Sequence, residues 1–413
     1  MIRMDISKTV FVILLFVFTL GETTRFDLGN SIFVKLTDFI VVVLVLAWLV
    51  KEIRHRKRDS GQGTYRMTGS ILLFVFIALI SLLVNIKNLS NSEFIVSFFY
   101  LARWVLYALL YYVVKSFSSE FKKKIMYILL ASGALIVLFG FIQYFFYPDL
   151  RNLYYLGWDE HLHRMFSTFL DPNFAGGFFV LYFIFLAGLF KYQLEKRGKL
   201  AMLIGIVSLF TLLAIYLTYS RSALVMLFVS SIVFLGFIKK VRWIIGLIII
   251  SAVFILLTSK SYYVENTNLF RIASVKARLD SAKIASKIIE NNPVLGVGFN
   301  SYRYAQIRYG FESRQNVFAN HAAAGTDNSF LFILATTGLL GLFSYLYLLF
   351  VALKQAYIVY SKTRKSVGIN ICLSIIVISS LFGLFANSLF INSLFYPIVM
   401  AWMWILLGLM VNK

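Results

Sequence analysis

Cysteine, proline and charge are all scarce in this sequence. With one cysteine among 413 residues, no disulfide can form within the chain, and a small disulfide-stapled fold is excluded. Only 14% of the residues are charged, whereas about a quarter are charged in an average soluble domain. Apolar residues dominate instead and make up 60% of the chain. This composition excludes an ordinary soluble domain and predicts a protein embedded in a lipid bilayer.

About twelve long apolar runs follow one another along the chain. A helix needs roughly 20 mostly apolar residues to cross the hydrocarbon core of a bilayer. The sequence therefore predicts an all-α, polytopic membrane protein whose single membrane domain covers residues 1–413. The first run is expected to be retained as a span, because further spans follow at once and no small-residue cleavage site is present. The predicted spans lie near 6–22, 31–50, 68–86, 94–114, 125–146, 174–190, 200–219, 222–238, 243–258, 328–353, 368–387 and 390–411.

The basic residues, which give the chain a net charge of +22, gather in alternate short loops. Short loops rich in lysine and arginine stay on the cytoplasmic side of a membrane. Both termini are therefore predicted to be cytoplasmic, and the charge is interpreted as a topology signal rather than as a nucleic-acid surface. Two longer loops, 147–173 and 259–327, are predicted to face outward. The basic loops lie at 51–66, 115–124, 191–199, 239–242 and 354–365.

Four polar clusters fall on the predicted outward side of the membrane. Each has a plain structural explanation: a helix N-cap at Asp171 or Asn173 and at Thr326, Asp327 or Asn328, or an interfacial anchor at Arg221. Residues 271–290 are expected to form an amphipathic helix that lies on the lipid headgroups or borders a site. The clusters are His161–Asn173, Tyr219–Ser222, 271–290 with the following Asn292–Gly298, and His321–Ser329.

These clusters also share the residue types of one kind of binding site. Arginine forks bind phosphate oxygens with two hydrogen bonds, and a carboxylate or imidazole can accept a proton from a hydroxyl. A sugar linked to an isoprenoid diphosphate would place its tail among the helices and its diphosphate at this boundary. The sequence has no Asp-x-Asp, no His-Glu-x-x-His and no Walker loop, so no metal and no cofactor are expected.

Four stretches occur in an order and spacing that resemble the O-antigen ligase / O-antigen polymerase family. The part of the chain that carries them covers roughly residues 160–345, and the plan of twelve spans with a large loop before the tenth is similar as well. The stretches are Arg164…Phe169-Leu170-Asp171-Pro172-Asn173-Phe174-Ala175, Ser220-Arg221, Asn292-Pro293-Val294-Leu295-Gly296-Val297-Gly298, and Asp327-Asn328-Ser329 followed by Gly338-Leu339-Leu340-Gly341.

The resemblance implies a metal-independent, inverting glycosyltransferase with a GT-C-like fold in the bacterial cytoplasmic (inner) membrane. Such enzymes take a glycan from undecaprenyl diphosphate at the outer face of that membrane. Ligases pass it to a lipid A-core sugar, whereas polymerases of O-antigen or exopolysaccharide pass it to a second lipid-linked repeat unit. The resemblance implies diphosphate binding by Arg221, with Arg164 and Arg278 assisting, and supporting roles for Asn173, Ser220 and Asn328.

The chain departs from the family pattern at the start of the tenth span. Ligases usually carry His-Asn-Ser there, with the histidine proposed as the base, whereas this sequence has Asp327-Asn328-Ser329. The base is therefore expected to be Asp327 or His321, which lies six residues earlier. An aspartate of ordinary pKa, about 4, is a weak base at neutral pH. Burial would raise its pKa and nearby arginines would lower it, and both ligase and polymerase activity stay open.

Two other functions fit a protein with many spans. A transporter or a flippase of lipid-linked glycans would carry polar groups near the middle of the membrane, often in inverted repeats. No clear repeat is present, and Lys35, Asp38 and Arg103 are the main charges within the predicted spans. Lys35 and Asp38 can pair on one helix face, and Arg103 can pair with a distant carboxylate or with a lipid phosphate. A non-catalytic membrane scaffold is the third hypothesis.

Overall fold

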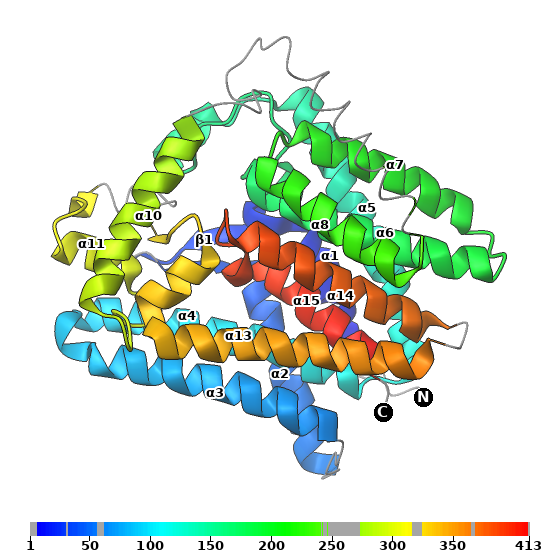
Figure 1. The fold of residues 1–413 in the computed structure, drawn as a ribbon, viewed down its shortest axis with the longest axis horizontal. Helices are drawn as coiled ribbons and strands as arrows, with labels where there is room; N and C mark the ends of the chain where they lie inside the picture. Colours follow the sequence, from blue (N-terminus) through cyan, green and yellow to red (C-terminus); the bar gives the residue numbers. More distant parts are fainter. Residues whose placement is uncertain are drawn as a thin grey trace.

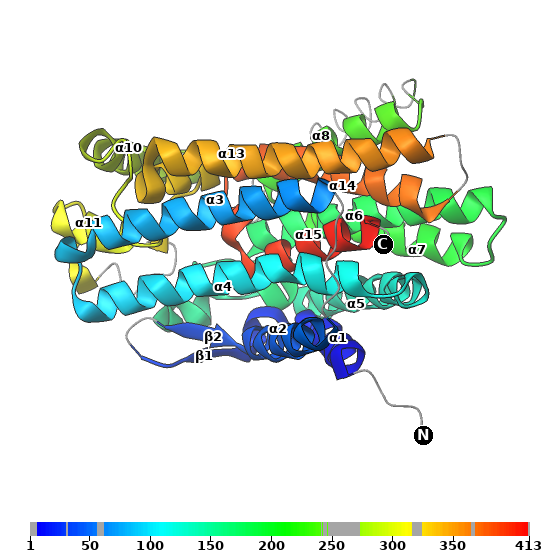
Figure 2. The same cartoon turned by 90° about the horizontal axis from the view of Figure 1, so that it is seen from below.

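Long apolar helices, several of them running side by side, make up the protein (Figures 1 and 2). The computed structural model describes residues 6–29, 32–55, 62–240, 242, 246, 273–315, 324–364 and 368–411. The longer helices are α1 (Ile6–Val17), α2 (Leu36–His55), α3 (Gln62–Val84), α4 (Asn91–Ser116), α5 (Ser119–Phe146), α6 (Pro172–Glu195), α7 (Ala201–Leu217), α8 (Arg221–Phe237), α10 (Ala273–Asn291), α13 (Ser329–Thr363), α14 (Ile369–Ser388) and α15 (Pro397–Met410).

The all-α, polytopic membrane architecture expected from the sequence is confirmed. Seven helices of the described residues are long and apolar enough to cross a membrane, and α7, α8 and α15 are shorter apolar helices. The expected ninth span, 243–258, lies outside the described residues except for residue 246. Within the described part, strand is limited to a small antiparallel hairpin, in which β1 (Arg25–Asp27) pairs with β2 (Phe33–Lys35) ahead of α2.

The two ends of the bundle differ. Figure 2 shows α10 and the short α11 (Tyr302–Arg308) at one end, together with the hairpin of β1 and β2, whereas α15 finishes toward the other. Capping residues start several helices at the end that carries α10. Ser90 and Glu93 form a capping box at α4, Asp171 caps α6, and Asn328 caps α13. Helix capping by Asp171 and Asn328 was one of the two interpretations that the sequence left open, and the structure shows it for both residues.

The core lies where α15 passes between α4, α6 and α14. Trp402 is fully buried and packs edge-on against Phe178 and Phe185, with ring centroids 5.2 and 5.4 Å apart. Trp104 contacts Trp404 in the same way at 6.2 Å. These large rings fill the space between helices without polar atoms facing lipid. They form a closely packed core between these helices.

Helix α13 is interrupted near its start, which the sequence did not predict. Gly338 has φ 66° and ψ −168°, a conformation that only glycine adopts readily. The freed backbone groups pair with the Asn292–Gly298 stretch: the Leu339 amide donates to the Pro293 carbonyl at 2.8 Å, and the Val297 amide to the Ala335 carbonyl at 2.9 Å. The helix continues beyond the apolar run that was expected to span the membrane near 328–353 and ends at Thr363.

Helix α3 holds this junction in place. The Ser81 hydroxyl lies 2.6 Å from the Leu295 carbonyl and 2.8 Å from that of Thr336, and the Asn85 amide donates to the Gly296 carbonyl at 3.0 Å. Gly296 and Gly298 both have positive φ, a conformation that glycine adopts readily in tight turns. The glycines of the two stretches therefore let three segments that are distant in the sequence meet through their backbones.

Candidate active site

The turn between α7 and α8 places Arg221 at the start of α8. Tyr219 has a positive φ of 48°, which makes the turn sharp enough to need no loop. Arg164 lies behind this turn, is only 2% exposed, and donates from Nε to the Thr218 carbonyl at 2.8 Å. Asn173 Oδ1 accepts from the Ser220 hydroxyl at 3.1 Å and from Arg164 Nη2 at 3.3 Å. The predicted residues Arg164, Asn173 and Ser220 are therefore brought together as the support of the turn that presents Arg221.

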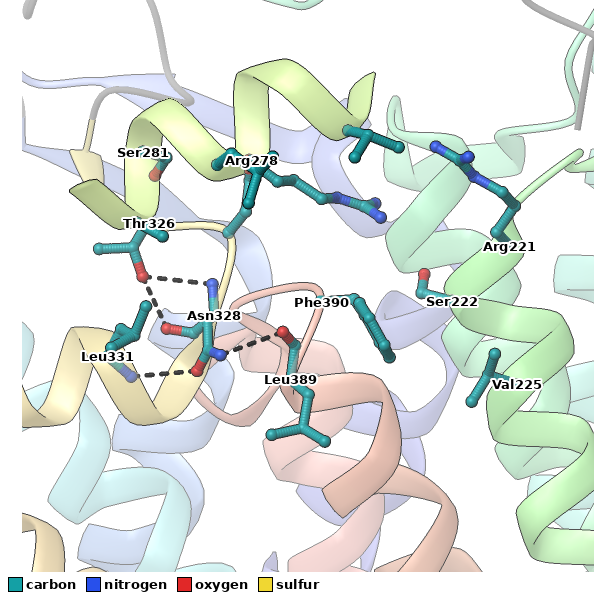
Figure 3. A pocket seen from close by; sticks show the side chains of 14 residues that line it. Arg221, Ser222, Val225, Arg278, Ser281, Thr326, Asn328, Leu331, Leu389 and Phe390 are labelled. Atoms are coloured by element: carbon teal, nitrogen blue, oxygen red, sulfur yellow. Dashed lines mark hydrogen bonds between the residues drawn. The ribbon is translucent and has the colours of Figure 1, made fainter. Parts of the chain in front are cut away.

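A first cavity of about 410 Å³ lies between α8 and α10. Figure 3 shows Arg221 of α8 and Arg278 of α10 extending toward each other from its two sides. Arg221 also donates to the hydroxyl of Ser274, near the start of α10. Within the described part of the chain, neither arginine has a carboxylate oxygen within 4.0 Å, so two cations that form no direct ion pair face one cavity, with Asp327 in the same lining. This arrangement suits an anion with several oxygens.

Apolar side chains form one wall of the first cavity, which is partly open to the surroundings of the protein. Val225, Leu279 and Phe390 are 41%, 57% and 38% exposed. Leu279 lies one residue beyond Arg278 on α10, and Val225 lies one helical turn after Arg221 on α8. The cavity therefore joins a cationic part to an exposed apolar wall, which fits a ligand that has an anionic head and a hydrocarbon tail.

Asp327 lies at the edge of this cavity, just before α13. Asn328 Oδ1 accepts from the amides of Phe330 and Leu331 at 2.8 and 3.0 Å, and its Nδ2 donates to the Leu389 carbonyl at 3.0 Å (Figure 3). These bonds fix the backbone from which the Asp327 side chain projects. Desolvation by the surrounding protein raises the pKa of Asp327 above its ordinary value; Arg278 opposes this shift and Asp171 adds to it. Desolvation thus outweighs the nearby guanidinium.

Comparison with known proteins gives one match: residues 206–346 fit the family model described as O-antigen ligase. The chain carries an O-antigen ligase domain. None of the curated proteins matches the chain. The matched stretch includes Arg221, Arg278, Asp327 and the Gly296–Gly338 junction, so the resemblance inferred from those motifs is confirmed. The matched domain supports a glycan-transfer function in the assembly of O-antigen or a related polysaccharide.

A second cavity, of about 310 Å³, lies on the other side of Asp327. Arg278, Thr326 and Asp327 line both cavities, so this short wall is all that they share. Asp327 of the O-antigen ligase domain therefore lies at the boundary between the two cavities, where ligands bound in each would come closest. The second cavity also reaches the N-terminal part of the chain, which lies outside the matched stretch, through Glu22 and Arg25.

Three carboxylates face this second cavity. Asp159 and Asp171 join Asp327 in its lining. Desolvation raises the pKa of Asp159 to about 6, with repulsion from Asp171 and Asp327 adding to the shift. The pKa of Asp171 is also raised, mainly by burial, although the Asn173 amide and Arg164 oppose the shift. Sequence reasoning missed Asp159, because nothing near it along the chain distinguishes it from an ordinary loop residue.

The side-chain oxygens of Asp159 and Asp171 also approach His161, and possible ligand atoms of the three residues lie within 4.8 Å of one another. A metal ion would compete here with a cation that the protein itself supplies. Arg164 Nη1 lies 3.4 Å from His161 Nδ1, and its positive charge opposes the rise in the pKa of both aspartates. Because a guanidinium can only donate, Nδ1 acts as the acceptor in this contact, and Nε2 of a neutral ring then carries the proton.

Charged residues of the N-terminal helices and hairpin form ion pairs at the second cavity, which Glu22 and Arg103 help to line. Lys35 pairs with Glu22, and Arg103 Nη2 lies 2.9 Å from Asp38 Oδ2. The side-chain pair of Lys35 with Asp38 that the sequence suggested is therefore wrong: the Lys35 backbone amide, not its side chain, donates to Asp38. Of the two partners suggested for Arg103, the structure shows the distant carboxylate. Sequence alone could not find Glu22, because it approaches Lys35 only when η1 (Phe18–Thr24) turns back on the hairpin.

The remaining site residue expected from the sequence, His321, lies outside the described residues. Among the others, Arg221, Arg278, Asp327 and Asn328 line the first cavity. Arg164 lines neither cavity, which separates it from the two arginines with which the sequence grouped it.

Proposed function

We propose that the protein transfers a glycan from a polyprenyl diphosphate, undecaprenyl diphosphate in bacteria, to a hydroxyl group of an acceptor sugar. The observation that carries this proposal is the first cavity, where Arg221 and Arg278 face each other beside an exposed apolar wall and next to Asp327. The reaction is placed at the outer face of the cytoplasmic membrane, with both termini and the basic loops inside and the segments 147–173 and 259–327 outside.

The donor would lie with its diphosphate between Arg221 and Arg278 and with its prenyl chain against Val225, Leu279 and Phe390. The leaving group of the transfer is a diphosphate, which gains negative charge as the sugar departs. Two guanidinium groups already held in place would stabilise this charge more in the transition state than in the bound donor. Arg164 would act indirectly, by fixing the turn that presents Arg221 through its bond to the Thr218 carbonyl.

The acceptor would approach from the second cavity and meet the donor at Asp327. Its hydroxyl oxygen forms the new bond to the anomeric carbon, the bond from that carbon to the diphosphate oxygen breaks, and the hydroxyl proton moves to the Asp327 carboxylate. A single displacement of this kind inverts the anomeric configuration. The raised pKa of Asp327 makes the carboxylate a better proton acceptor, which supports its assignment as the base.

An assay of glycan transfer with the purified protein tests this proposal. Purified protein is given a lipid-linked glycan and an acceptor, and formation of the glycosidic product is followed. Arg221→Ala and Asp327→Asn are each expected to lower turnover by at least about 100-fold, the range found when a charge-stabilising or acid–base group is removed. Arg151→Ala is the matched control, because Arg151 is exposed, pairs with Asp149 at 2.7 Å, and lines neither cavity. Full turnover in both site variants would refute the assignment.

The choice between ligase and polymerase depends on the acceptor, which is either a lipid A-core sugar or a second lipid-linked repeat unit. The surface glycan of a deletion strain separates them. Loss of the chain-length ladder on the lipid carrier would identify a polymerase, whereas complete chains accumulating on the polyprenyl diphosphate would identify a ligase.

A further inference from the structure

The second cavity contains buried acceptor atoms that no described residue satisfies. Glu22 is only 5% exposed; Arg25 Nη1 lies 3.9 Å from its Oε2, but this oxygen accepts no hydrogen bond in the described part of the protein. The same holds for the Asn392 side-chain oxygen. Both residues line the cavity. Since buried polar atoms are almost always paired in folded proteins, these two indicate a ligand that brings hydrogen-bond donors.

Negative charge also faces this cavity without a matching cation. Among the described residues, Asp159, Asp171 and Asp327 have no lysine or arginine nitrogen within 4.0 Å. Two arginines of the cavity have anionic partners: Arg103 lies 2.9 Å from Asp38, and Arg25 lies 3.9 Å from Glu22.

Two further guanidinium groups border the cluster. Arg278 belongs to the wall shared with the first cavity, and Arg164 is buried behind His161 and Asn173. The three aspartates therefore line the cavity without a direct ion pair among the described residues, and Arg278 lies at the edge of the cluster.

Aromatic rings supply the remaining surface of the cavity. Tyr396 stacks on Phe174 with ring centroids 4.2 Å apart and lies 5.9 Å from the ring of Phe169. Tyr100 and Trp158 also line the cavity. Flat apolar faces next to carboxylate and amide oxygens suit a sugar ring, which offers C–H groups on its faces and hydroxyl donors around its rim.

We propose that the second cavity binds the terminal sugar of the acceptor and selects a sugar without negative charge, one whose rim carries hydroxyl or amino donors. A uronic acid or a phosphorylated sugar would place its anion against Asp159, Asp171 and Asp327, and like charges facing each other in a partly desolvated cavity repel strongly. This inference rests on the proposed transfer reaction, but it concerns binding and can be tested without turnover.

Matched glycosides test the selectivity. The full-length protein in nanodiscs is titrated with methyl glucoside, methyl glucosaminide and methyl glucuronide, and with the corresponding galactosides, and binding is followed by saturation-transfer NMR. The neutral and amino glycosides of at least one configuration are expected to bind, and the uronate of that configuration at least about tenfold more weakly, as like-charge juxtaposition predicts. Equal or tighter binding of the uronate, or no binding by any glycoside, would overturn the proposal.

The variant Asp159→Asn links selectivity to this cluster. Asp159 is an exposed residue that lines the cavity, so its replacement is expected to leave the fold intact. In this variant, the ratio of the affinity for the neutral glycoside to the affinity for the uronate is expected to fall severalfold. Asp149→Asn is the control, because Asp149 lies on the same loop, pairs with Arg151 and lines neither cavity.

An unchanged preference in Asp159→Asn, or an equal change in Asp149→Asn, would contradict the proposal. The proposed transfer reaction and the proposed charge selectivity can be refuted separately. Charge-selective binding by a protein that transfers no glycan would refute the proposed function alone, whereas transfer to a uronate-ended acceptor as fast as to a neutral one would refute the selectivity alone.

Discussion

Gly338 marks the break in α13, and replacing it with alanine tests how the site is held together. Its φ of 66° and ψ of −168° lie in a region that other residues reach only with about 1–3 kcal/mol of strain. An added Cβ would also overlap the carbonyl group of Val294. Relief of that overlap would separate the Asn292–Gly298 stretch from α13.

The size of the effect follows from the bonds that would be lost. The Leu339–Pro293 and Val297–Ala335 hydrogen bonds, at 2.8 and 2.9 Å, each contribute about 0.5–1.5 kcal/mol net. Together with the strain, Gly338→Ala is expected to destabilise the protein by about 2–6 kcal/mol. Because the first turn of α13 follows Asp327 directly, transfer activity should fall as well.

Thermal unfolding of the purified protein in one detergent measures this effect. The control is Gly236→Ala in α8, where an added Cβ meets no atom within 4 Å and the change should be within about 1 kcal/mol of neutral. A Gly338→Ala protein that unfolds at the same temperature as the Gly236→Ala protein would refute the role assigned to the break.

Three further predictions concern the site. Arg164→Lys should lower both the unfolding temperature and turnover, since lysine cannot replace the fork that binds the Thr218 and Tyr219 carbonyls and Asn173; an unchanged unfolding temperature would contradict its role as a support. Turnover of the wild type should fall as pH drops through the raised pKa of Asp327, because the protonated carboxyl cannot accept a proton; Asp327→Asn should lose this acid limb from a pH–rate profile. Leu279→Ser should raise KM for the lipid-linked donor with little change in kcat, because Leu279 is expected to contact the prenyl chain rather than the reacting atoms; steady-state kinetics would show an effect on kcat alone if this is wrong.

Much of the architecture could be predicted because it depends on patterns of residues that are close together in the sequence. Apolar runs of spanning length became helices, and polar residues such as Asp171 and Asn328 capped them as their types predict. Arg221, Arg278 and Asp327 could be grouped in advance, since alternating loop charge placed all three on one predicted side. The structure places them around one cavity.

What could not be predicted depends on contacts between distant segments. The partners of Lys35 and Arg103 were not apparent, because Glu22 and Asp38 reach them only through the packing of the first spans. Arg164 looks like a ligand-binding arginine in the sequence, and only its burial against the Thr218 carbonyl shows its supporting place. The junction of Gly338 with residues 292–298 likewise exists only as a tertiary contact.

The central claim is tested most directly by counting products in a reconstituted reaction. Protein in proteoliposomes receives a glycan linked to undecaprenyl diphosphate together with an acceptor and a metal chelator, and free undecaprenyl diphosphate and new glycosidic bonds are both measured. We predict that one glycosidic bond of inverted configuration forms for each undecaprenyl diphosphate released. The Arg221→Ala variant is expected to form neither product. Movement of the lipid-linked glycan across the bilayer without any glycosidic product would contradict the account and identify a transporter.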